Sequence, residues 1–133
     1  MKNRLLCIVL TILVVTSGCA SEKKKDSLES TLRLYERSIK WGSYADAQTL
    51  TAKPEAQERL DRYNEIKVIS YEVLRQEIVG DFEQINQIVD IKFYHEQQGK
   101  IETVRDTQVW IYNQDRESWV LQTGLPDFMS VVR

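Results

Sequence analysis

The sequence predicts an α+β domain in which N-terminal helices are followed by an antiparallel sheet of about four strands. The first observation is a helical period of apolar residues between residues 26 and 50. The second is a change, near Ile66, to stretches rich in β-branched and aromatic residues that alternate with a period of two. The third is the short turn sequences between these stretches, which begin at Gly80, Gln97 and Asn113.

The first helix is predicted over residues 26–41. One face carries apolar residues at i, i+4, i+7 and i+11, namely Leu28, Leu32, Tyr35 and Ile39. Asp26 is expected to cap this helix, with Glu29 three residues later as in a capping box. Gly42 is expected to end it.

Two shorter helices are expected next. One spans residues 43–50, and the other has Pro54 in its first turn and directs Leu60 and Tyr63 inward.

Four strands are predicted from residue 66 onward: residues 66–79, 85–95, 101–112 and 119–123. The first alternates imperfectly, because Val68-Ile69 and Val73-Leu74 are adjacent apolar pairs, which indicates a bulge or a strong bend. The second alternates cleanly, with one face apolar. The sheet is therefore expected to be curved.

The N-terminal segment has the composition of an export signal. Lys2 and Arg4 precede an apolar run over residues 5–15, and small residues then lead to Cys19. The run is too short to span a bilayer core, which takes about 20 apolar residues.

This pattern resembles the lipobox of bacterial lipoproteins, although Thr16 stands where leucine is usual. The resemblance implies that residues 1–18 are a signal peptide, that Cys19 is lipidated, and that residues 19–26 form a polar tether to a single domain over residues 27–133. The membrane is then a partner through the lipid. Ala20 in place of Asp favours the inner leaflet of the outer membrane, facing the periplasm. The alternative is an ordinary secretory signal with a chance cysteine.

Composition excludes some function classes. Without Lys2 and Arg4 the chain has 16 basic and 20 acidic residues, a formal charge of −4, and such a chain is a poor nucleic-acid binder. A lipidated Cys19 leaves the mature chain no thiol, and His95 is the single histidine. We therefore expect no zinc site of several His or Cys ligands, and no cofactor.

Helices followed by long antiparallel strands resemble the nuclear transport factor 2-like superfamily, a cone-shaped α+β roll. The resemblance is carried by the helix over residues 32–41, the corner GSYADA at 42–47, and the closing hairpin TQVWIY at 107–112 with WVL at 119–121. It spans about residues 27–128 and implies an apolar pocket at the open end of the cone, or dimerisation through the sheet.

Members similar to ketosteroid isomerase place an acid, a tyrosine and a base in that pocket. Here the resemblance offers five candidates: Tyr35, Asp46, Asp90, Arg105 and Asp106. No motif ties them to catalysis; core packing for Tyr35 and a solvated helix position for Asp46 are the alternatives. Arg105 and Asp106 are neighbours on a strand, so one of them faces the interior or a partner.

The third strand is apolar on both faces. Trp110 and Tyr112 lie on one face, while Val109 and Ile111 lie on the other. The second face is covered either by a partner, a second copy or an envelope protein, or by sheet curvature and the C-terminal tail with Phe128.

These observations favour a lipid-anchored, non-enzymatic binding or assembly module of the envelope. The alternatives are a small pocket enzyme of isomerase or dehydratase type and a carrier of a small apolar ligand. A cone filled by its own side chains would argue against both.

Overall fold

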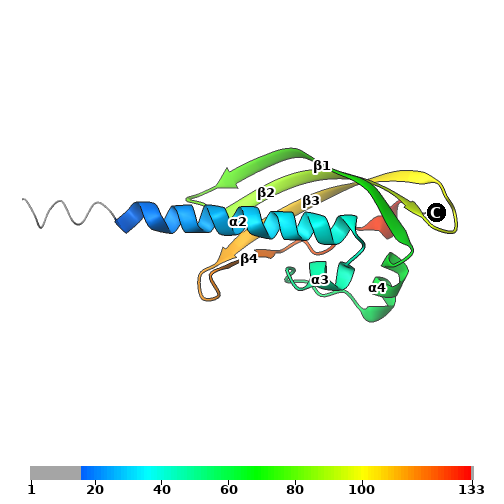
Figure 1. The fold of residues 1–133 in the computed structure, drawn as a ribbon, viewed down its shortest axis with the longest axis horizontal. Coiled ribbons are helices and arrows are strands. Elements are labelled where there is room, and N and C mark those ends of the chain that lie inside the picture. Colours follow the sequence, from blue (N-terminus) through cyan, green and yellow to red (C-terminus); the bar gives the residue numbers. More distant parts are fainter. Residues whose placement is uncertain (1–15, 133) are drawn as a thin grey trace, which may run out of the picture.

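A computed structural model describes residues 16–132, and it has the α+β fold that the sequence predicts. The signal peptide predicted over residues 1–18 lies mostly outside this range. The helices are α2 (Thr16–Lys40), α3 (Tyr44–Gln48) and α4 (Gln57–Tyr63), and the strands are β1 (Ile66–Val79), β2 (Gln84–His95), β3 (Ile101–Asn113) and β4 (Ser118–Leu121), before the 3₁₀ helix η1 (Phe128–Ser130). The sheet is antiparallel throughout, in the order β1-β2-β3-β4. It curves around α2, with α3 and α4 near the C-terminal end of that helix (Figure 1).

Helix α2 is longer than predicted. It begins at Thr16, so the segment expected to be a tether is helical and Asp26 is not a cap. The Asp26 backbone oxygen accepts a hydrogen bond from Ser30 Oγ inside the helix. A capping signature is local, and the four residues directly before Asp26, Glu-Lys-Lys-Lys, are themselves good helix formers. The helix ends as predicted, at Gly42 with φ +71°.

The third helix begins later than predicted, and Pro54 precedes it instead of lying in its first turn. The preceding segment is held beside β4. Leu121 N donates to Leu50 O, and Ala52 N donates to Leu121 O, both at 2.8 Å. Ala56, the residue before the helix, has an extended backbone, so α4 begins only at Gln57.

The predicted irregularity of the first strand is confirmed. The pairing of β1 with β2 shifts between Val68 and Ser70, and again between Val73 and Arg75. From Arg75 to Val79 the register is regular. Two bulges bend the strand, and β1 forms one edge of the curved sheet.

The alternation of β2 and β3 places one set of side chains on the concave face. Ile85, Val89, Ile91 and Phe93 are fully buried there, opposite β3 residues that include Val104 and Trp110. The interior of the cone is filled by these side chains together with Tyr35 and Ile39 of α2.

The C-terminal tail packs inside the fold and does not cover the convex face. Phe128 contacts Phe93 with a ring separation of 4.9 Å, whereas Ile111 on the convex face is 39% exposed. The prediction that the C-terminal tail covers the second face of β3 is therefore wrong.

Candidate functional site

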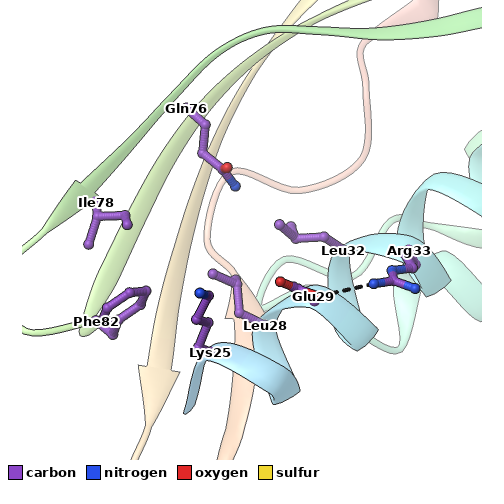
Figure 2. A pocket seen from close by; sticks show the side chains of 8 residues that line it. All are labelled: Lys25, Leu28, Glu29, Leu32, Arg33, Gln76, Ile78 and Phe82. Atoms are coloured by element: carbon purple, nitrogen blue, oxygen red, sulfur yellow. Dashed lines mark hydrogen bonds and ion pairs between the residues drawn. The ribbon is translucent and has the colours of Figure 1, made fainter. Parts of the chain in front are cut away.

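An open groove lies between the middle of α2 and the C-terminal half of β1. Its volume is about 530 Å³. Figure 2 shows the side chains around it: Leu28 and Leu32 project from α2 toward Ile78 of β1 and Phe82 of the following turn. Leu28 is buried, but Ile78 is 51% exposed. The floor is thus apolar and still open to solvent.

The rim of the groove is charged. Lys25, Glu29 and Arg33 stand on α2, and Gln76 closes the β1 side. Arg33 Nη2 donates to Glu29 Oε2 at 3.0 Å, with both side chains more than half exposed. An exposed pair of this kind contributes little to stability. An apolar floor with a polar rim is the composition of a binding surface.

The turn that supplies Phe82 is strained. Phe82 has φ +51°, a left-handed conformation that is uncommon for a bulky side chain. Gly80 in the same turn also has positive φ, +68°. The turn places an aromatic ring against the core at the end of the groove, and backbone strain of this kind concentrates at functional positions.

A buried polar network crosses the concave face behind the groove. Gln108 is at its centre: its Nε2 donates to Asp106 Oδ2 at 2.7 Å and to Tyr71 OH at 2.9 Å. Its Oε1 accepts from Gln87 Nε2 at 3.2 Å and from Trp110 Nε1 at 3.1 Å.

The network reaches the groove on one side only. Gln76 Nε2 donates to Gln87 Oε1 at 3.2 Å, and Gln76 also lines the groove. Asp106 is not among the residues that line the groove.

Burial changes the acid–base properties of this network. It raises the pKa of Asp106 to about 6, while the hydrogen bond from Gln108 acts in the opposite direction. Burial, and to a lesser degree the charge of Asp106, also raises the pKa of Tyr35. The Tyr35 hydroxyl has no hydrogen-bond partner within residues 16–132. The interior therefore holds an acid that changes charge near neutrality.

The structure separates the predicted candidates into two groups. Tyr35, Asp106 and Trp110 face the interior, and the rings of Tyr35 and Trp110 meet edge to face at 5.2 Å. Asp90 and Arg105 pair on the convex face, where Arg105 donates twice at 2.8 Å and lowers the pKa of Asp90.

Two further candidates lie elsewhere. Asp46 is exposed on α3, which is the solvated helix position that was the alternative to a pocket role. Tyr112 is partly buried beside Trp119, with ring centroids 5.4 Å apart. The five pocket candidates therefore do not come together in one site.

The sequence reasoning missed Gln76, Gln87 and Gln108, and it missed Tyr71. Gln87 and Gln108 are polar residues at buried positions of the alternating strands β2 and β3. That parity was a usable signal, since a buried amide needs partners.

The N-terminal end of α2 is tied to the sheet. Trp119 Nε1 donates to Lys24 O at 3.0 Å, and Lys24 Nζ lies 5.0 Å from the centre of the Tyr112 ring. Cys19 is exposed one and a half turns before Lys24 on the same continuous helix. The groove therefore has a fixed position relative to Cys19.

No helix from residue 16 to 132 has the length and apolar composition to cross a membrane. The same range holds no cluster of three His, Cys, Asp or Glu side chains placed to bind a metal ion.

Comparison with known proteins gives no further constraint: no family model matches the sequence, and no curated protein matches it significantly.

Proposed function

We propose that this chain is a lipid-anchored envelope lipoprotein whose domain binds an apolar segment of a partner protein without catalysis. Residues 2–19 support the anchor, through the basic start, the short apolar run and Cys19. The order of elements and the curved sheet support kinship with nuclear transport factor 2-like proteins, placed on the periplasmic side of the outer membrane.

The observation that carries the binding function is the open groove between α2 and β1. Its floor consists of Leu28, Leu32, Ile78 and Phe82. Small-molecule sites usually bury most of their ligand, whereas half-exposed Ile78 leaves this groove open on one side. An open apolar trough suits side chains presented by another protein.

Its position also supports an anchored function. Helix α2 runs without a break from Cys19 to the groove, and Trp119 and Tyr112 hold its first turns against the sheet. The groove is then presented at a fixed height above the bilayer, within reach of a membrane-associated partner.

A second function, a small pocket enzyme or a carrier, is favoured by one observation. Asp106 has a raised pKa and is linked through Gln108 to Tyr71 in an interior that is largely apolar, which is the environment of a general base. Against it, the cone is filled by side chains such as Trp110 and Phe93, and a substrate would have to displace Gln76 and Gln87 to reach the acid. The binding function needs no such opening.

The anchor is tested first. The wild-type chain is expected to incorporate labelled fatty acid and to be cut before Cys19. Cys19→Ala is expected to incorporate none and to keep residues 1–18, because both steps require the thiol. Lipidation with two or more acyl chains holds a protein stably on a bilayer. A Cys19→Ala chain that is cut to the same length as the wild type, or a wild-type chain that incorporates no fatty acid, would contradict the lipoprotein assignment.

The groove is tested by photo-crosslinking in intact envelopes. A photoreactive amino acid at Phe82 is expected to capture one defined protein, and the same group at Ile111 on the convex face is the matched control. Leu32→Gln, which keeps the helix but removes an apolar contact, should lower capture about tenfold, since one buried side chain is worth roughly 1.5 kcal/mol. Equal capture at both positions, or capture indifferent to Leu32→Gln, would argue against the groove as the binding site.

A further inference from the structure

The free edge of β1 is the most apolar exposed feature of the described chain. Strand β1 pairs with β2 on one side and with no strand of residues 16–132 on the other. Nine large hydrophobic residues in that range are exposed, and five of them lie on β1: Ile69, Val73, Leu74, Ile78 and Val79. An edge with unpaired backbone groups and apolar side chains is a template for another strand.

We propose that two copies of the chain associate by antiparallel pairing of their β1 edges, about a two-fold axis at Gln76. The sequence around this residue is Leu74-Arg75-Gln76-Glu77-Ile78. When a second copy runs in the opposite direction about Gln76, Leu74 of one copy lies opposite Ile78 of the other, and Arg75 lies opposite Glu77. Such self-complementarity is what a two-fold interface between identical chains requires.

Charge specifies this register. With Gln76 on the axis, Arg75 of each copy lies opposite Glu77 of the other, and opposite charges directly across an antiparallel pair are favourable. A shift of the axis by one residue in either direction places Arg75 opposite Arg75, or Glu77 opposite Glu77. Like charges in those positions are destabilising, so the neighbouring registers that keep the same faces aligned are disfavoured.

The local geometry fits this exchange. Arg75 and Glu77 lie on the convex face, in the regular stretch that pairs with Ile88 and Asn86 of β2. Within one chain they form a long contact, 3.8 Å from Arg75 Nη2 to Glu77 Oε2, and the side chains are 69% and 56% exposed. Each is free to turn to the opposite strand.

The pairing also extends the groove. Ile78 lines the groove, and Leu74 of the second copy lies opposite it in the proposed register, adding an apolar side chain at the open side. Both α2 helices lie on the same face of the resulting eight-stranded sheet. The two-fold axis directs the N-terminal ends of the two α2 helices, with Cys19, in opposite directions along that face, so both anchors reach one bilayer when the sheet lies along it.

A cysteine at the axis tests the proposal in the full chain on membranes. Opposed Cα atoms of an antiparallel pair are about 4.5–5.5 Å apart, within the range that a disulfide spans. Mild oxidation of Gln76→Cys is therefore expected to give a disulfide-linked homodimer. Glu72→Cys, exposed on the same strand, is the matched control, because its two copies would be about 27 Å apart. The wild-type chain controls for Cys19.

Charge reversal makes the test specific. In the Gln76→Cys background, Glu77→Arg should lower the homodimer yield on the order of tenfold, because two attractive pairs become repulsive. Adding Arg75→Glu should restore the yield. Circular dichroism checks that each variant is folded.

The results of this disulfide test can be distinguished from those of the photo-crosslinking test of the groove. The β1 pairing is supported if Gln76→Cys gives the disulfide-linked homodimer and Glu72→Cys does not. The double charge reversal must also restore the yield that Glu77→Arg lowers. A folded Gln76→Cys chain that forms no homodimer, forms one regardless of charge, or crosslinks to a different protein overturns it. None of these results depends on lipidation or on what Phe82 captures.

Discussion

Replacing Phe128 with alanine is expected to lower the free energy of unfolding by about 3–5 kcal/mol, the usual cost of removing a fully buried aromatic side chain. Phe128 is 0% exposed although it lies only five residues from the end of the chain. The change is measured by urea denaturation of the full chain, with circular dichroism as the signal that monitors unfolding.

The physical reason is that the ring joins three elements. It meets Tyr44 of α3 at 5.9 Å, Tyr63 of α4 at 5.4 Å and Phe93 of β2 at 4.9 Å, each edge to face. Aromatic pairs in this geometry contribute about 0.5–1.5 kcal/mol beyond the area they bury. Tyr63 OH also donates to Pro126 O at 2.7 Å, which holds the tail in place.

Trp41→Ala is the control for this substitution. Trp41 is also a large aromatic residue, but it is 80% exposed, so its loss should change the unfolding free energy by no more than about 0.5 kcal/mol. If Phe128→Ala were as mild as Trp41→Ala, the tail would not be part of the core.

The elements of this fold were predictable because they depend on short-range periodicity. Leu28, Tyr35 and Ile39 recur on one helical face, and all three are buried. The adjacent pair Val73-Leu74 indicated a bulge, and the register shifts there. The start of α2 was not predictable from the capping signature at Asp26, because a cap is only a local preference and Lys and Glu extend the helix beyond it.

The groove could not be predicted, because its sides are far apart in the sequence. Leu32 and Phe82 meet only once α2 is laid on the curved sheet, and neither residue stands in a motif. Strand parity did predict that one of Arg105 and Asp106 faces inward. Choosing Asp106 required the hairpin register, which pairs Arg105 with Asp90 on the convex face.

Asp106→Asn is expected to change how stability depends on pH. The pKa of Asp106 is raised from 3.8 to about 6 by burial, so between these values the folded chain holds a proton that the unfolded chain has lost. The wild type then loses stability as the pH rises from about 4 to 6, by about 3 kcal/mol in all. Asparagine does not titrate. Relative to wild type, the variant should therefore gain about 3 kcal/mol between pH 3.5 and 7.5.

Asp90→Asn is the matched control, because it removes a carboxylate of opposite behaviour. The hydrogen bonds from Arg105 lower the pKa of Asp90, so its contribution to stability is present above its unfolded pKa and is lost as the pH falls. Urea denaturation of both variants at several pH values should give slopes of opposite sign relative to wild type. Parallel curves for Asp106→Asn and wild type would mean that Asp106 is ionised in the fold as readily as in the unfolded chain. Such a result would also remove the one observation that favours an acid–base enzyme over a binding module.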